Sequence, residues 1–111
     1  MAAKTNIVLD QGCDFQVTIN VQNFNDVPVN LTGYTGYAQM RKHYTSSNAY
    51  SFGVTIVPQD GEVVLAMSAN TTETIAAGRY VYDCELVSVT GIRTRIVEGF
   101  VTVTPQVTRN G

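Results

Sequence analysis

The chain has 111 residues, of which 44% are hydrophobic and 14% are charged, with a net charge of −2 and an isoelectric point of about 5.1. This length suits one domain that buries its own core, and the apolar content excludes a disordered chain. The weak negative charge excludes a general nucleic-acid binder, which needs clustered lysine and arginine, and no apolar run is long enough for a membrane span.

The N-terminal part of the chain predicts two strands. Its start, MAAKTNIVLDQG, lacks the long apolar segment of a secretory signal, so we expect the protein to fold in a cytosol. Residues 6–9 predict a short strand and 10–12 its turn. From Cys13 to Gln22, apolar residues alternate with polar ones, which is typical of a strand with one face on a core and one in water. Residues 23–28 predict a turn.

The middle of the chain continues with a period of two. Residues 34–44 predict a strand with Ala38 and Met40 pointing inward, and 52–57 predict the next strand. The PQDG sequence at 58–61 predicts a hairpin turn. The following strand, 62–67, places three apolar residues on one side, namely Val63, Leu65 and Met67.

One segment, 68–77, shows no alternation. Asn70 and Glu73 resemble a capping box, and Gly78 suits the position after a helix end. These residues predict one or two helical turns, with Ile75 closing an end of the sandwich.

The last third of the chain predicts a hairpin. The segment GRYVYDCEL at 78–86 alternates, which places four side chains on the core face: Tyr80, Tyr82, Cys84 and Leu86. Residues 88–91 predict a turn, and 92–104 predict a long strand that ends at Pro105. The apolar residues change parity along this strand, and a β-bulge at Gly99 would absorb the change.

Together these segments predict an all-β fold, an immunoglobulin-like antiparallel β-sandwich of about seven strands with one short helical turn. Residues 1–111 form a single domain, and we expect short flexible tails at 1–5 and 105–111 that lie against neighbouring subunits.

Two carboxylates in the GRYVYDCEL strand raise the question of catalysis. Asp83 and Glu85 point the same way, roughly 6.5–7 Å apart along the strand, a spacing that a paired-carboxylate hydrolase would use. An outer sheet face, however, is not expected to provide a cleft. We therefore predict solvated carboxylates that pair with Arg93 or Arg95 across the hairpin.

Cysteine and histidine usage gives no metal or cofactor site. Tyr82 stands two residues before Cys84, as in the tyrosine corner of immunoglobulin domains, and a Cys13–Cys84 bridge is conceivable. A cytosolic origin and the lack of tryptophan favour two free, buried thiols instead. His43 has no partner cysteines nearby, and we expect Arg41-Lys42-His43 to be a solvated strand tip.

Four tyrosines, Tyr34, Tyr37, Tyr44 and Tyr50, lie in or near one predicted hairpin. Exposed there, they would form a sugar-binding or protein-binding patch. Ordinary packing within a sandwich explains them equally well.

Several motifs, taken in order, resemble a known group of proteins. They are GCDF at 12–15, VNLTGYTGYAQMRKHY at 29–44 and the run from DGEVVLAM at 60–67 through GRYVYDCEL to GFVTVTPQVTR at 99–109. The chain resembles small structural proteins of tailed-phage virions. Their immunoglobulin-like module recurs in the N-terminal domains of baseplate upper proteins and in tail-fibre and neck components. Cys84 departs from the pattern, since an aliphatic residue is more usual there.

The resemblance implies a non-enzymatic virion protein that docks onto other virion subunits as a tail/baseplate or neck/fibre-attachment adaptor. It implies several copies per particle, assembly in the host cytoplasm, and no nucleic-acid, membrane, metal or cofactor partner. Two alternatives stay open, a capsid decoration (cement) protein and a carbohydrate-binding module. The candidate interaction surface consists of the four tyrosines with two residues near the C-terminus, Val107 and Arg109.

Overall fold

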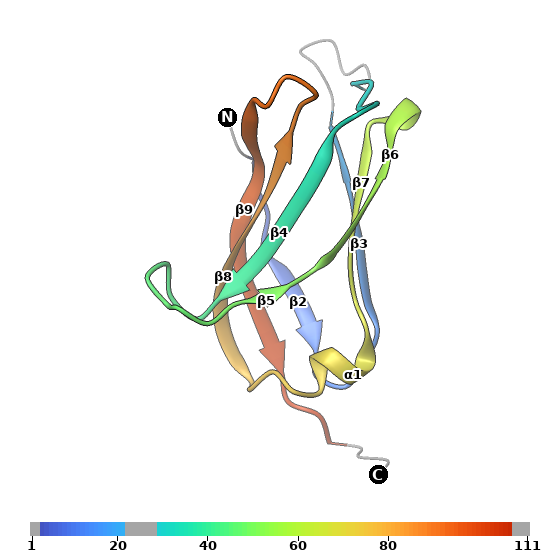
Figure 1. Ribbon diagram of the computed structural model, residues 1–111. Helices are drawn as coiled ribbons and strands as arrows, with labels where there is room; N and C mark the ends of the chain where they lie inside the picture. Colours follow the sequence, from blue (N-terminus) through green and yellow to red (C-terminus); the bar gives the residue numbers. More distant parts are fainter. Residues whose placement is uncertain (1–2, 22–28, 108–111) are drawn as a thin grey trace.

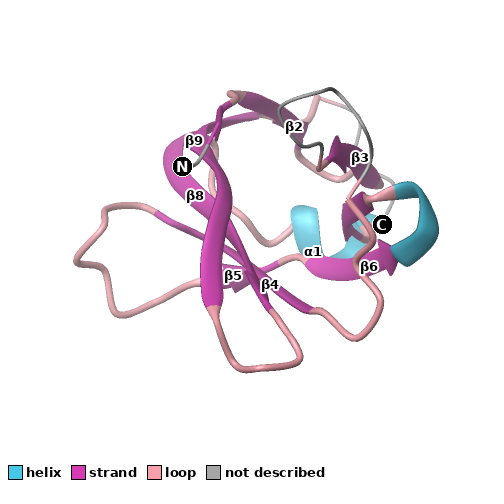
Figure 2. Ribbon diagram, turned by 90° about the horizontal axis from the view of Figure 1, so that it is seen from above, coloured by secondary structure: helices cyan, strands magenta, loops and turns pink. Residues whose placement is uncertain are grey.

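The computed structural model describes residues 3–21 and 29–107. Strands account for 55% of it, in two sheets that face each other (Figures 1 and 2). The strands are β1 (Ala3–Lys4), β2 (Ile7–Asp10), β3 (Phe15–Asn20), β4 (Thr35–Arg41), β5 (Tyr50–Ser51), β6 (Gly53–Val57), β7 (Glu62–Met67), β8 (Gly78–Val87) and β9 (Arg93–Thr104). Two short helices accompany them, the 3₁₀-helix η1 (Pro58–Asp60) and the α-helix α1 (Ala69–Thr72).

The larger sheet has the order β1-β9-β8-β4-β5, with β2 also paired to β9, and the smaller sheet has the order β3-β7-β6. The all-β, sandwich-like prediction is confirmed, but the prediction of a purely antiparallel arrangement is wrong at one place. The segments β1 and β2 run parallel to β9. The N-terminal segment occupies the edge that β9 leaves free, and it runs in the same direction as β9.

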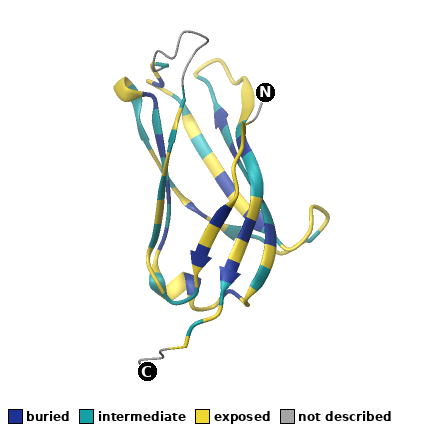
Figure 3. Cartoon of the chain, turned by 180° about the vertical axis from the view of Figure 1, so that it is seen from behind, coloured by how far each residue is buried: buried dark blue, intermediate teal, exposed yellow. Residues whose placement is uncertain are grey.

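The core lies between the two sheets, where the alternation of each strand buries one face (Figure 3). The predicted inward residues of β4, β7 and β8 are all buried. The largest side chains with almost no exposure are Leu9, Leu31, Met40, Leu65 and Ile75. Burial of each such side chain stabilises the fold by roughly 1.5–3 kcal/mol relative to exposure.

The chain crosses from one sheet to the other through a single residue, Phe52, between β5 and β6. Its backbone N–H donates to the carbonyl of Ala38 on β4 at 3.0 Å. Its buried ring lies 6.0 Å from the ring of Phe15 and 6.3 Å from that of Tyr82, between centroids. One side of the sandwich is therefore closed by the backbone itself.

The helical turn forms where the sequence predicts it, but its cap differs. Helix α1 begins after Ser68, and the backbone N–H of Ala69 donates to the carboxylate of Asp14 at 2.7 Å. Asn70 lies inside the helix and is not its cap. Gly78 opens β8, so the predicted helix-ending glycine is also wrong. A carboxylate from a distant part of the chain takes the place of a local cap, because it accepts one of the free N–H groups of the first helical turn.

Two buried residues fasten this turn to the end of the sandwich. The hydroxyl of Thr72 donates to the carbonyl of Cys13 at 2.9 Å and accepts the N–H of Gly12 at 3.0 Å. Ile75 is fully buried, as predicted, and its carbonyl accepts the side-chain amide of Gln11 at 2.9 Å. The turn therefore closes one end of the core.

The bulge in β9 lies three residues before the predicted position. Cys84 pairs with Val97 and Glu85 with Arg95, which leaves Ile96 as the extra residue. Gly99 serves a different purpose, since a Cβ atom there would lie 2.2 Å from the carbonyl oxygen of Thr5. The glycine makes room for the N-terminal segment rather than for a bulge.

The described part of the predicted N-terminal tail belongs to the sheet. The N–H of Thr5 donates to the carbonyl of Glu98 at 2.9 Å, and the carbonyl of Thr5 accepts the buried hydroxyl of Tyr82 at 2.6 Å. The side chain of Asn6 accepts the N–H of Phe100 at 3.1 Å. Residues 3–5 are therefore joined to the sheet by hydrogen bonds.

At the other terminus, Gln106 donates its N–H to the side chain of Gln11 at 2.9 Å, and Val107 is 95% exposed. The predicted turn at 23–28 and the last part of the C-terminal tail lie outside the described residues. Within the described ranges, no helix has the length and apolar character needed to cross a membrane.

Both cysteines are free, but only Cys84 is buried, whereas Cys13 is exposed. Cys13 lies in the turn before β3. The alternation that directs Phe15 toward the core therefore does not apply to Cys13. Burial, and then the charges of Asp83 and Glu85, raise the pKa of the Cys84 thiol to about 12. The thiolate of Cys84 is therefore disfavoured in the folded protein.

We expect Gly99→Ala to destabilise the protein by about 1–3 kcal/mol, because the new methyl group displaces the Thr5 backbone. The matched control is Gly53→Ala in β6, whose added Cβ would lie 3.6 Å from the nearest atom. Urea unfolding of both variants measures the difference. Equal losses of stability in the two variants would contradict the close approach at Gly99.

A maleimide reagent should modify Cys13 in the folded protein and leave Cys84 unmodified, because Cys84 is buried and its pKa is raised. After denaturation without a reductant, both thiols should react. Intact mass after each step reads out the result. An untreated mass short by the two hydrogens of a disulfide would show that the bridge forms.

Candidate functional site

The outer face of the larger sheet carries a grid of polar and charged side chains. Odd-numbered residues of β4 and β8 point away from the core, and the strand register sets them opposite one another. On β9, the register places Arg95 opposite Glu85 and Glu98 opposite Asp83. Two rows therefore cross the three strands, Tyr37–Glu85–Arg95 and Gln39–Asp83–Glu98.

The bulge at Ile96 creates part of this grid. Residues three apart in a regular strand point to opposite faces, but the extra residue brings Arg95 and Glu98 to the same face. Their closest side-chain atoms, Nη1 and Oε1, lie 3.7 Å apart, and Nε of Arg95 lies 3.3 Å from Oδ2 of Asp83. One guanidinium group therefore links two carboxylates from neighbouring strands.

A second arginine completes the network. Nη1 of Arg93 donates to Oε1 of Glu85 at 2.9 Å, and the guanidinium carbon lies 5.6 Å from the ring centre of Tyr37. The predicted pairing of the two β8 carboxylates with Arg93 and Arg95 is confirmed. Exposed pairs of this kind contribute only about 0–1 kcal/mol each to stability. Their larger effect is to fix the orientation of the side chains on this face.

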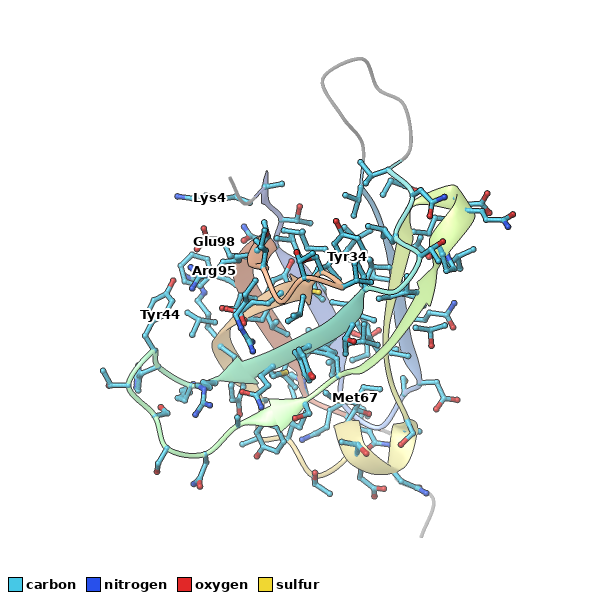
Figure 4. All side chains as sticks on the ribbon, turned by 45° about the horizontal axis from the view of Figure 1, so that its top comes forward. Lys4, Tyr34, Tyr44, Met67, Arg95 and Glu98 are labelled. Carbon is cyan, nitrogen blue, oxygen red and sulfur yellow. The ribbon has the colours of Figure 1, made fainter. Side chains whose placement is uncertain are left out.

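The loop between β4 and β5 forms a wall beside the grid, projecting from the body of the molecule (Figures 1 and 2). Nη1 of Arg41 donates to the carbonyl of Ser46 at 2.6 Å, and the N–H of His43 donates to the Ser46 hydroxyl at 3.0 Å. Tyr44, which is 75% exposed, lies on the same side as Arg95 and Glu98 (Figure 4). The predicted strand tip is therefore a folded turn that presents Tyr44.

Between this wall and the sheet lies an open hollow of about 660 Å³. Its polar and aromatic lining consists of Tyr37, Gln39, Arg41, Tyr44, Asp83, Glu85, Arg93, Arg95 and Glu98, with Ala38, Val81 and Tyr82 beneath them. The expectation that this face has no cleft is wrong. The projecting β4–β5 loop contributes Tyr44 to one side of the hollow, and β4, β8 and β9 form its floor.

The carboxyl group of Asp83, which lines the hollow, has a raised pKa. Burial raises the pKa of its carboxyl group, and the charges of Glu85 and Glu98 raise it further. Arg95 and the more distant Arg41 act in the opposite direction but do not offset burial. Partial burial therefore outweighs the neighbouring guanidinium group in setting the pKa of this carboxyl group.

The four predicted tyrosines do not form one patch. Tyr37 and Tyr44 line the hollow, whereas Tyr34 and Tyr50 are half-buried and pack against the core. The ring of Tyr50 meets that of Tyr80 edge-on, with centroids 6.3 Å apart. Val107 follows the end of β9, and Arg109 lies outside the described residues. Packing therefore accounts for Tyr34 and Tyr50, and the interaction role of Tyr37 and Tyr44 stays a prediction.

The charged members of the hollow were not predicted as a site. The alternation within each strand could have indicated part of the site. It places Tyr37 and Gln39 on one face of their strand, and Asp83 and Glu85 on one face of theirs. The sequence alone did not give the register of β9 against β8, which decides which β9 side chains line the hollow. Only the bulge at Ile96 brings both Arg95 and Glu98 to this face.

No protein-family model matches this chain, and no curated protein matches it significantly. Among residues 3–21 and 29–107, no three histidine, cysteine, aspartate or glutamate side chains are grouped so that they could hold a metal ion. The function is therefore inferred from the geometry of the chain and from its sequence motifs.

The pKa of the Asp83 carboxyl should lie above the ordinary value for aspartate, as measured by NMR titration of its carboxyl carbon. Glu98→Gln should lower that pKa and Arg95→Gln should raise it, because each variant removes one of the charges that act on it. The opposite response to both variants would contradict the network.

The sign of the effect on stability follows from linkage. The folded-state pKa of Asp83 is raised, so the folded chain holds this proton more tightly than the unfolded chain does. Its contribution to stability is present below the unfolded-state pKa and is lost as the pH rises through the folded-state pKa.

Proposed function

We propose that this chain is a non-enzymatic structural protein of a tailed-phage particle, an adaptor of the tail, baseplate, neck or fibre attachment that docks onto other virion subunits. The ordered motifs from residue 12 to residue 109 support the phage assignment. The observation that carries the docking role is the open edge of β3, described below.

The proposal includes an immunoglobulin-like topology. In immunoglobulin domains, one sheet contains the third, sixth and seventh strands side by side, and the other contains the second, fifth and fourth. The orders β9-β8-β4-β5 and β3-β7-β6 are compatible with that arrangement. The additional strands β1 and β2, parallel to β9, are where this chain differs from the constant-type domain.

Strand β3 is an edge of the smaller sheet, and among the described residues it pairs only with β7. The N–H of Val21 donates to the carbonyl of Gly61 on the β7 side at 2.7 Å, which sets the phase of the ladder. Odd-numbered residues of β3 bond to β7, so the backbone groups of Gln16, Thr18 and Asn20 face the open edge. A strand from a neighbouring subunit can bond to them.

The long last strand does not serve this purpose. Strand β9 is bonded to β8 on one side and to β1 and β2 on the other. We therefore assign docking by strand addition to β3, one of the two edge strands of the smaller sheet. The exposed side chains of β3 are neutral and polar, in keeping with a surface of few charges.

The non-enzymatic role is supported by the resemblance carried by the ordered motifs. The two carboxylates on β8 each direct one oxygen to an arginine, Asp83 at 3.3 Å and Glu85 at 2.9 Å, as expected for ion pairs across a hairpin.

The location can be tested by mass spectrometry of purified particles, with heads separated from tails. The chain should be found with the tails, baseplates or neck structures. Recovery with the heads alone would favour the capsid decoration alternative, and absence from particles of either kind would contradict the virion proposal.

The docking strand can be tested with Thr18→Pro, which removes the outward N–H and blocks the edge, and with the control Thr18→Val, which keeps it. Proline is tolerated on edge strands, so the thermal midpoint of Thr18→Pro should stay close to that of the control. Incorporation into particles should be lost only with proline. Equal incorporation of the two folded variants would contradict docking through β3.

A further inference from the structure

The hollow on the outer face of the larger sheet has a lining without net charge. Three arginines and three acidic residues line it, and their formal charges cancel. The ion pairs of Arg93 and Arg95 engage one oxygen of each carboxylate, and Arg41 donates to the carbonyl of Ser46 and to Oε1 of Gln39. A charged ligand therefore gains little from the field of this site.

The lining also contains apolar surface, and its exposed aromatic rings are those of Tyr37 and Tyr44. Besides the two tyrosine rings, its apolar groups are Ala38 and Val81 from the floor of the sheet. The hollow has a volume of about 660 Å³, which is that of a small-ligand site, for which roughly 300–1,000 Å³ is usual.

The side chains that remain are suited to hydroxyl groups. Carboxylates accept hydrogen bonds, guanidinium groups donate them, and the amide of Gln39 does both. Vicinal hydroxyl groups of a sugar match such planar, fixed pairs of acceptors and donors. The C–H face of a sugar ring packs against an aromatic ring, and Tyr44 and Tyr37 are 75% and 52% exposed.

The site is also held in place before any ligand arrives. The ion pairs across β8 and β9 restrain the charged groups, and the Arg41–Ser46 bond restrains the loop that carries Tyr44. Restraint of this kind reduces the entropy that binding would otherwise cost.

We propose that this hollow binds a neutral oligosaccharide. Tyr44 stacks on one sugar ring from the loop, Tyr37 contacts the ligand at the opposite end, and Gln39, Asp83 and Arg95 hydrogen-bond to its hydroxyl groups. The proposal does not depend on the phage assignment, since it rests on the geometry of this face alone.

The test uses the ¹⁵N-labelled full chain and NMR titration with four probes at millimolar concentration, namely maltotetraose, cellotetraose, mannotetraose and tetra-N-acetylchitotetraose. At least one probe should give saturable shifts centred on Tyr37, Gln39, Tyr44 and Asp83. Tyr44→Ala should weaken that binding about tenfold, since it removes an exposed stacking ring. Tyr44 lies in a loop outside the core, so the variant keeps the fold.

The matched control is Phe100→Ala, because Phe100 is an exposed aromatic residue on the same sheet face outside the hollow. It should leave the affinity for the probe unchanged. The proposal is overturned if none of the four probes gives saturable shifts, or if Phe100→Ala weakens binding as much as Tyr44→Ala does. Binding of a Ser/Thr-rich tetrapeptide in the hollow without binding of any of the sugars would also overturn it.

Discussion

One additional residue in β9, Ile96, determines both faces of the larger sheet. Before it, the odd-numbered Arg93 and Arg95 point outward, and after it the odd-numbered Val97, Val101 and Val103 point inward. Without the bulge, a single parity would place either arginines in the core or valines in water. A regular β9 could not have its arginines on the outer face and its valines in the core at the same time. The bulge allows both arrangements in one strand.

The larger sheet also depends on how its N-terminal segment is held. The backbone of Thr5 is bonded on one side to β9 and on the other to the hydroxyl of Tyr82, which projects from β8 within the core. Burial raises the pKa of that hydroxyl to about 12, so it remains a donor at every physiological pH. Gly99 leaves the space in which this contact is made.

Local patterns predicted local structure well. Alternation identified the inward residues of β4, β7 and β8, and the PQDG turn joins β6 to β7 as expected. The errors lie where the decisive contact is far away in the chain. Gly99 is explained by Thr5, the cap of α1 comes from Asp14, and the exposure of Cys13 follows from the turn that precedes β3.

The candidate site was predictable only in part for the same reason. The ion pairs across the β8–β9 hairpin could be predicted from the sequence, because the two strands are consecutive and are joined by a short turn. The hollow requires the register of three strands, a bulge of one residue and the direction of the β4–β5 loop. The alternation of polar and apolar residues within a single strand determines none of these three features.

The crossing at Phe52 has a mechanical meaning. One residue spans about 3.3 Å in an extended chain, so β5 and β6 have almost no slack with which to move apart. On the opposite side of the sandwich, β2 and β3 are joined by a longer connection, residues 11–14. The two sheets are consequently held at the closest spacing along the chain on the Phe52 side of the sandwich.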